Sequence, residues 1–417
     1  MKLHHWIAAA VLALAATLSQ AAYYVWETVT LSLSTGASCG NGTPYRFFIN
    51  RTPFNRHYAL TFEGGGACWD QDSCEGKGDY SASNPGGIPS DYMFQANAAA
   101  GGLVTPFSAR TDPFQSVRTQ SWNLVYLPYC TGDVHSGNTV RIYSDTDPAA
   151  PRVQYHAGQA NIRAAADWLR RKEGRPGQLL MTGFSAGGVG ATTNYAVVRD
   201  TLAPKGKTTL LADSGPLFNA PRGGDPALYP SLPLHDTIRA AWGLDDAGSL
   251  IPVLKAKMPA LDENNMGSLA PTLARRYPKD RFGYMAYQED MIFSGFSYTD
   301  FYDDISQAPN DAVRRARLNA RWRQDLNGWL PLLASAPNVS YHIPFYRSFN
   351  DAHCLSIVDF SNTGIEEAGL ADLTPFINNA LDRKPPLRTV EADQVSDLSR
   401  PMSAAMTILA IVLDFFG

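Results

Sequence analysis

The segment 183–187, which reads GFSAG, constrains the fold of this chain more than any other. An apolar run at 178–182 leads into it, and small residues beginning at Ala186 follow it. The apolar run predicts a buried strand, and the small residues predict a helix that continues to about Arg199. Glycines on both sides of a serine suit a sharp turn in which neighbouring backbone passes too close for a Cβ atom. The sequence therefore predicts that Ser185 stands exposed on a tight strand-to-helix turn.

Apolar runs and helical patterns alternate on both sides of this turn. The dense run at 122–129 (WNLVYLPY) is typical of a buried parallel strand, and 157–172 has the apolar spacing of a helix. Such alternation predicts an α/β fold with a mostly parallel sheet and crossover helices. The other expected strands are 24–33, 45–50, 56–62, 208–212, 281–288 and 339–347.

The composition supports one large unit. Hydrophobic residues make up 45% of the chain, and neither an internal repeat nor a low-complexity linker divides it. We expect a single catalytic domain over 22–417, with cap insertions at about 220–280 and 295–335. The segment from 67 to about 119 has no strong period and is expected to form a long irregular excursion.

The N-terminus has the pattern of an export signal. Lys2 and two histidines precede an apolar run at 6–18, and 19–21 supplies small residues for a signal peptidase. The run is too short to span a bilayer comfortably, which takes about 20 residues. We expect a signal peptide over 1–21, a secreted or periplasmic protein, and no stable membrane insertion after cleavage.

Charge and cysteine content exclude some partners. A formal net charge of −4 gives no electrostatic case for nucleic acid or for an anionic membrane surface. Five cysteines suit an oxidising compartment, and their odd number leaves one free or paired outside the chain. Cys68 and Cys74 are close enough in sequence to close a small loop. Because there is no CxxC pair and no HExxH motif, we expect no metal site.

Three consecutive glycines at 64–66 follow an expected strand well before Ser185. In an α/β-hydrolase, the N–H after the nucleophile and an N–H from a glycine-rich loop stabilise the tetrahedral oxyanion. Gly65, Gly66 and Ala186 are therefore the candidate oxyanion-hole residues. A phosphate-cradling loop is the alternative for three glycines, but no GK[ST] follows them. These features favour a serine hydrolase with an α/β-hydrolase-like fold and Ser185 as its nucleophile.

The chain order of this fold, serine then acid then histidine, narrows the choice of the catalytic base. His353 follows a late strand in the loop SFNDAHC and is the expected base. His235 falls in the expected cap, before the last strands of the sheet. His342 lies inside a strand, where an imidazole that simply packs is the simpler interpretation.

The same chain order limits the candidates for the catalytic acid. Asp290 follows the strand expected at 281–288 and is the expected acid. Asp213, at the end of an earlier strand, and Glu289 are the alternatives. Asp351 is disfavoured because it is too close in sequence to the histidine.

Five sequence blocks form a distinctive ordered set: FEGGGACWDQDSC at 62–74, PYCTGDVHSG at 128–137, GFSAGGVGA at 183–191, ADSGPLFN at 212–219 and DAHC at 351–354. In these blocks the chain resembles the pectin acetylesterase and Notum family of carboxylesterases. The cysteine spacing of the first block and the Tyr-Cys-x-Gly-x-x-x-Ser-Gly pattern of the second are more specific than G-x-S-x-G alone. Together the blocks span most of the mature chain.

The resemblance implies the fold and the reaction. Such a protein is an α/β-hydrolase that removes an acyl group from an ester, acetyl from plant-wall pectin or palmitoleoyl from a signalling protein. It uses no metal or organic cofactor. The resemblance also implies the site: a triad of Ser185, Asp290 and His353 with an oxyanion hole of Gly65, Gly66 and Ala186.

Two departures from the plant members concern the site. Plant members carry Trp before the first Cys of GGGWC, whereas this chain has Ala67 there and places Trp69 after the cysteine, which alters the wall near the acyl group. Their acid block reads like Tyr-Asp-x-Trp-Gln, whereas 287–290 reads YQED.

A third departure concerns the cysteines. Plant members have a second cysteine ahead of the His-Cys pair, and 348–350 (SFN) lacks it. Without that cysteine, Cys354 is expected to pair with Cys39 or Cys130 instead. The pairing beyond Cys68 and Cys74 stays open at this point.

The function expected from the sequence is that of an exported serine carboxylesterase. Its expected substrate is an acylated polysaccharide such as acetylated pectin, and Trp69 and Tyr129 are expected to contact it. Longer acyl esters, polyesters and acylated proteins are alternative substrates. A non-catalytic secreted binding protein on a hydrolase scaffold is the alternative outside enzymes.

Overall fold

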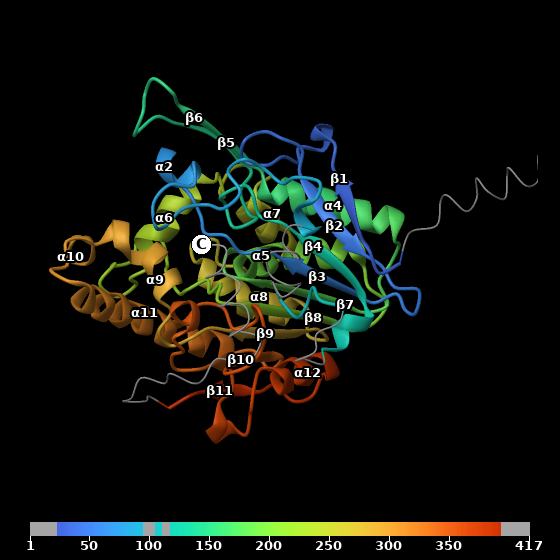
Figure 1. Cartoon of the computed structure of the whole chain (residues 1–417). Coiled ribbons are helices and arrows are strands. Elements are labelled where there is room, and N and C mark those ends of the chain that lie inside the picture. The colour runs from blue at the N-terminus through green and yellow to red at the C-terminus, as the bar shows by residue number, and fades with distance from the viewer. Residues whose placement is uncertain (1–22, 95–104, 111–116, 393–417) are drawn as a thin grey trace, which may run out of the picture.

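A computed structural model describes residues 23–94, 105–110 and 117–392 (Figure 1). The main sheet consists of β1 (Trp26–Thr30), β2 (Arg46–Asn50), β3 (Tyr58–Phe62), β4 (Asn123–Leu127), β7 (Leu179–Phe184), β8 (Thr208–Asp213), β9 (Arg281–Met285), β10 (Val339–Ile343) and β11 (Arg388–Val390). The nine strands lie in the order β1-β2-β4-β3-β7-β8-β9-β10-β11. β2 pairs antiparallel with β1 and β4, and all the remaining neighbours pair parallel. The mostly parallel α/β sheet is therefore confirmed.

Side chains of the central strands alternate between two hydrophobic cores. In β3, Leu60 lies in one core and Ala59 in the other, and Met181 and Leu180 of β7 divide in the same way. The first core includes residues of α4 (Gly158–Lys172) and α5 (Ala186–Leu202), and the second includes residues of α12 (Thr374–Asp382). Because both faces of the sheet are covered, its central strands are apolar at nearly every position.

The other α-helices in the described part of the chain are α2 (Gln71–Cys74), α6 (Leu232–Ala241), α7 (Leu250–Lys257), α8 (Leu269–Arg276), α9 (Met291–Tyr298), α10 (Asp303–Ser306) and α11 (Asp311–Ala334). The first expected cap insertion contains α6 to α8, and the second contains α10, α11 and the end of α9. α8 packs against α5 and α11 packs against β10, so parts of both insertions support the body of the fold (Figure 1). The division into one domain with two caps stays a prediction.

Several elements differ from the sequence-based expectation. β5 (Thr139–Tyr143) and β6 (Arg152–His156) form an unexpected antiparallel ribbon that projects from the body, and β11 adds an edge strand (Figure 1). The strand expected at 281–288 ends at Met285. The strand expected at 339–347 ends at Ile343, because Pro344 follows and has no N–H for the ladder.

The cysteines form two disulfides among the described residues. Cys68 pairs with Cys74, which confirms the small loop, and Cys39 pairs with Cys130. Cys354 is a buried free thiol, so the suggestion that it pairs with Cys39 or Cys130 is wrong. Those two cysteines meet each other because the loop after β1 lies against the chain that leaves β4, where Gly40 N–H donates to the carbonyl oxygen of Cys130 at 2.7 Å.

The expected signal peptide at 1–21 lies outside the described residues. Within the part of the chain that the structure describes, no helix combines the length and the apolar character that crossing a membrane requires.

Candidate active site

Ser185 occupies the strand-to-helix turn that the sequence predicts. β7 ends one residue before it and α5 begins one residue after it. Its φ of 55° and ψ of −127° form a strained conformation for a residue with a side chain, costing about 1–3 kcal/mol. Its N–H donates to the carbonyl oxygen of Asp213 at 2.9 Å, and its own carbonyl oxygen accepts from Gly188 N–H at 2.9 Å. These hydrogen bonds hold the turn between two parallel strands and the first turn of α5.

The glycine loop at 64–66 lies directly against this turn. A Cβ atom added to Gly64 would lie 3.0 Å from Cβ of Ser185. Gly66 has a φ of 68°, and a Cβ there would lie 2.1 Å from the carbonyl oxygen of Ser81. Both positions therefore require glycine, one for close approach and one also for backbone conformation. Gly66 and Ala186 line the same pocket as Ser185, so the loop and the start of α5 border the serine.

Glu63, immediately before the glycines, anchors this loop. One carboxylate oxygen accepts from the hydroxyls of Tyr92 at 2.7 Å and Tyr126 at 2.8 Å, and the other accepts from Tyr129 N–H at 2.8 Å. Desolvation raises the pKa of Glu63 to about 7, and these three hydrogen bonds oppose the rise. The carboxylate thus ties the end of β3 to the chain that leaves β4. Sequence reasoning did not single out Glu63, although it stands inside the block FEGGG.

His353 and Asp290 form a hydrogen-bonded pair in the interior. His353 Nδ1 donates to the Asp290 carboxylate, at 2.8 Å from Oδ2 and 3.0 Å from Oδ1. Asp290 is 0% exposed, and its Oδ1 also accepts from Phe293 N–H at 2.8 Å. With Nδ1 engaged by the carboxylate, Nε2 is the ring nitrogen left to exchange a proton.

The electrostatic surroundings favour a protonated His353. Burial by itself lowers the pKa of this imidazole. The charge of Asp290 and its hydrogen bond raise the pKa, with a smaller contribution from the charge of Asp213, and the net result lies above the ordinary value of 6.5. An imidazole of this kind is suited to accept a proton and to hold it for the next step.

Sheet topology explains how two residues 63 positions apart meet. β9 and β10 are parallel neighbours, so the segments that leave them start at the same edge of the sheet. The two segments stay together beyond the strands: Gln288 N–H donates to the carbonyl oxygen of Pro344 at 2.9 Å, and Glu289 N–H to that of Phe345 at 3.3 Å. Asp290 therefore emerges beside the chain that leads to His353.

Asp213, the main alternative acid, contacts the histidine loop at other points. Its carboxylate accepts from Leu355 N–H at 3.0 Å, and from both the N–H and the hydroxyl of Ser356 at 2.7 Å. Its carbonyl oxygen accepts from Ser185 N–H. One buried residue thus links the serine turn to the histidine loop, a role that sequence reasoning missed because the partners are 142 and 143 residues away.

The other candidates have partners elsewhere. Glu289 forms an ion pair with Arg323 at 2.8 Å, and Asp351 forms one with Arg315 at 3.2 Å. His342 is buried in β10 with both ring nitrogens in hydrogen bonds. The structure brings none of these three residues to His353 through a hydrogen bond that joins their side chains.

An apolar pocket of about 530 Å³, including its open mouth, has Ser185 in its wall. Helices α6 and α9, the glycine loop and the segment after β8 contribute most of the lining. Its largest apolar side chains are those of Trp69, Leu217, Leu234, Ile238, Trp242, Phe293 and Phe296. A pocket of this composition suits the hydrocarbon part of an ester.

The two residues expected to contact substrate lie in different places. Trp69 lines the pocket. Tyr129 is 0% exposed, and its hydroxyl accepts from Val134 N–H at 2.8 Å. Contrary to expectation, Tyr129 is a core residue here, because the chain after β4 turns inward to meet Glu63.

Comparisons with known proteins identify the family. Residues 18–225 match the family described as Pectinacetylesterase. Over 192 residues the chain is 27% identical to the palmitoleoyl-protein carboxylesterase NOTUM of Mus musculus. The chain belongs to the pectin acetylesterase and Notum family. Its similarity to the mouse protein covers 44% of this chain and 35% of the relative, so the chain matches about a third of that protein's length.

Two further proteins are similar to this chain, one in sequence and one in structure. A Danio rerio protein named inactive palmitoleoyl-protein carboxylesterase notum1b is 24% identical over 106 residues, which cover 25% of this chain and 70% of the relative. The structure of the Wnt deacylase Notum from Drosophila has a TM-score of 0.58, with 18% identity over 88% of this chain and 96% of that one. This likeness confirms the α/β-hydrolase-like fold.

The region that matches the Pectinacetylesterase family contains only part of the candidate site. Glu63, the glycine loop, Ser185 and Asp213 lie within residues 18–225. Asp290 and His353 lie beyond them and are placed by the fold.

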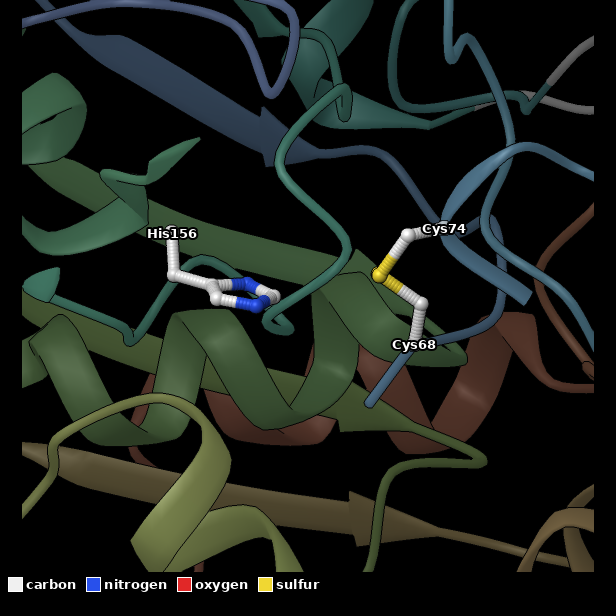
Figure 2. A group of neighbouring side chains, drawn as sticks. All are labelled: Cys68, Cys74 and His156. Atoms are coloured by element: carbon white, nitrogen blue, oxygen red, sulfur yellow. A yellow bond between two sulfur atoms is a disulfide. The ribbon is translucent and has the colours of Figure 1, made fainter. Parts of the chain in front are cut away.

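A group of potential metal ligands in this family member is fully engaged within the protein. Figure 2 shows Cys68, Cys74 and His156, whose ligand atoms lie within 4.8 Å of one another. The two cysteines are joined in a disulfide and so offer no thiolate. The ring nitrogens of His156 lie 3.1 Å from the carbonyl oxygen of Thr131 and 3.0 Å from the hydroxyl of Tyr143. We interpret this group as structural.

Proposed function

We propose that this protein is an exported serine carboxylesterase with Ser185 as nucleophile, His353 as base and Asp290 as acid. The observation that carries the proposal is the Asp290–His353 pair on a loop that Asp213 ties to the Ser185 turn. Membership of a family of carboxylesterases supports the same reaction.

In this mechanism His353 first accepts a proton as a base and then gives it up as an acid. His353 Nε2 takes the hydroxyl proton of Ser185 as the oxygen attacks the ester carbonyl, while Asp290 holds the imidazolium. Backbone N–H groups of Gly65, Gly66 and Ala186 stabilise the resulting oxyanion. His353 then protonates the departing alcohol. Water attacks the acyl-enzyme with the same histidine as base, and the carboxylic acid and the free serine are released.

The expected substrate is an acyl ester of a polysaccharide, with acetylated pectin as the first candidate because of the family description. The apolar pocket beside Ser185 favours a second candidate, an ester with an acyl group longer than acetyl. The mouse relative is named for a palmitoleoyl-protein substrate. A graded series of p-nitrophenyl esters from acetate to dodecanoate distinguishes the two candidates.

The first test is hydrolysis of p-nitrophenyl acetate and of acetylated pectin by the wild-type protein and by Ser185→Ala. We expect the substitution to lower kcat by about 10⁶-fold, because the nucleophile and its base act as a unit. A fluorophosphonate probe should label the wild-type protein at Ser185 only. Equal hydrolysis by both proteins, or failure of the probe to label Ser185, would contradict the mechanism and favour a binding protein on this scaffold.

A further inference from the structure

His235 lies in the apolar lining of the pocket. It stands in the first turn of α6, and Leu234, Ile238 and Trp242 from the same part of the chain line the pocket with it. Its side chain is the only imidazole in the described lining, and Ser185 contributes the only hydroxyl. The residue is 5% exposed, so its ring borders the pocket rather than bulk solvent.

The imidazole of His235 lacks the partners that other buried histidines have. Its Nδ1 is buried without a hydrogen-bond partner among the described residues. Side-chain hydrogen bonds hold each of the other buried histidines: His135, His156, His342 and His353. Because Nδ1 is closed off from the pocket as well as from solvent, the ring nitrogen that a ligand in the pocket can meet is Nε2, which has no hydrogen bond to the described residues. A polar atom without a partner in an otherwise apolar lining points to a partner supplied by the ligand.

The ring is neutral under ordinary conditions. Burial lowers the pKa of His235 to about 4, and the charge of Arg239 one turn further along α6 adds to this effect. Arg239 itself is engaged with Asp245 at 2.6 Å and with the carbonyl oxygen of Glu263 at 2.8 Å. Nε2 of a neutral imidazole donates or accepts according to the tautomer, and a hydroxyl group can pair with it in both cases without a charged ligand.

We propose that His235 selects an acyl group that carries a hydroxyl on its hydrocarbon chain, so that the preferred substrates are esters of hydroxy acids. The proposal rests on the proposed esterase function and adds the chemical class of the acyl group. The apolar side chains of the pocket contact the hydrocarbon, and the ring of His235 forms a hydrogen bond with the hydroxyl. An unsubstituted acyl chain would leave the imidazole without this partner, and a site with an unmet hydrogen bond discriminates against such a ligand.

The test measures kcat/KM for matched methyl esters by following release of the acid. Methyl hexanoate is compared with methyl 3-hydroxyhexanoate and methyl 6-hydroxyhexanoate, which place the hydroxyl near and far from the carbonyl. 2-Hydroxyethyl hexanoate carries the hydroxyl on the alcohol part and serves as the control for position. We expect at least one hydroxyacyl ester to exceed methyl hexanoate by about tenfold or more, and the alcohol-side hydroxyl to give no such gain.

Three variants assign the preference to His235. His235→Leu removes both ring nitrogens with little change in volume and should reduce the hydroxyacyl-to-hexanoate ratio by about tenfold or more. His235→Gln keeps a donor and an acceptor and should restore part of the ratio. Ile238→Leu changes a neighbouring side chain of the same pocket without altering polarity and should leave the ratio unchanged. Because the ratio compares two substrates of one protein, a general loss of activity does not move it.

The outcomes separate the two proposals. Hydrolysis of all the esters with the same ratio in wild type and His235→Leu would overturn the assignment of His235 and leave the esterase intact. A preference for the alcohol-side hydroxyl would also overturn it. Absence of hydrolysis of every ester, together with no fluorophosphonate labelling of Ser185, would overturn the proposed function itself.

Discussion

The pocket beside Ser185 has one wall at the carboxyl ends of the sheet strands and another built from helices α6 and α9. The polar groups that support the sheet-edge wall, outside the pocket lining itself, are held by several hydrogen bonds each. Glu63 accepts three, Asp213 accepts bonds from two residues of the histidine loop and from Ser185, and the Asp290 carboxylate contacts both His353 and a backbone N–H.

The helical wall is held mainly by apolar packing. Leu234, Ile238, Phe293 and Phe296 line it, and the one imidazole among them, that of His235, has a buried nitrogen without a partner in the described residues. Hydrogen bonds fix atoms in direction as well as distance, whereas apolar contacts tolerate changes of shape. The difference suggests that the sheet edge sets the chemistry and the helical wall sets the choice of substrate.

The largest effect on catalysis is expected from Asp290→Asn, a substitution in the hydrogen-bonded region at the sheet edge. We expect a loss of about 10⁴-fold in kcat on p-nitrophenyl acetate, because the amide no longer orients or stabilises the imidazolium. Since the base must be neutral to act, wild-type activity should fall as the pH drops through the raised pKa of His353, and the variant's residual activity should fall at a lower pH. The control is Asp351→Asn, which alters a surface ion pair in the loop that carries His353. A loss of less than tenfold for Asp290→Asn would remove it from the triad.

Substitution of Glu63, which anchors the glycine loop, should have a smaller effect on kcat. Glu63→Ala should lower kcat by about 10²-fold, because three donors lose their acceptor and the oxyanion loop shifts. Glu63→Gln has one acceptor oxygen for Tyr129 N–H and an NH2 that can donate to the tyrosine hydroxyl oxygens, so it keeps part of this network and its kcat should fall less than that of Glu63→Ala. Equal kcat for Glu63→Ala and wild type would show that the loop is held without this carboxylate.

The raised pKa of Glu63 also predicts how the stability of the protein depends on pH. The folded pKa of Glu63, about 7, exceeds its ordinary value of 4.5, so the folded state holds the proton more tightly than the unfolded chain. Wild type therefore loses stability as the pH rises from about 4.5 to 7, by at most about 3 kcal/mol. Glu63→Gln lacks this term, and its Tm relative to wild type should be higher at pH 8 than at pH 5. A difference in Tm that is the same at both pH values would contradict this.

The smallest expected effect lies in the helical wall. Ile238→Phe fills part of the pocket and should lower the ratio of kcat/KM for p-nitrophenyl hexanoate to that for the acetate by about tenfold, since the longer acyl group loses space. Leu228→Phe, at a position that is 65% exposed and outside the pocket, is the matched control. An unchanged ratio for Ile238→Phe would mean that the acyl group lies elsewhere.

Some features of this protein depend on short stretches of sequence. The turn at Ser185, the apolar strands around it and the glycine loop are local, because backbone space and the covering of both sheet faces act on neighbouring residues. The small loop closed by Cys68 and Cys74 is local in the same sense. Sequence by itself therefore determined the α/β class, the position of the turn and most of the sheet.

Other features were decided only by the tertiary structure. Which acid meets His353 depends on how the segments after β9 and β10 run together, and Asp213 meets its partners across more than 140 residues. The free thiol of Cys354 and the bond between Cys39 and Cys130, 91 residues apart, depend on the same kind of long-range packing. The place of His235 in the pocket wall likewise follows from how α6 folds back over the sheet edge. Contacts between distant segments depend on the packing of the whole chain, and no short stretch of sequence carries that information.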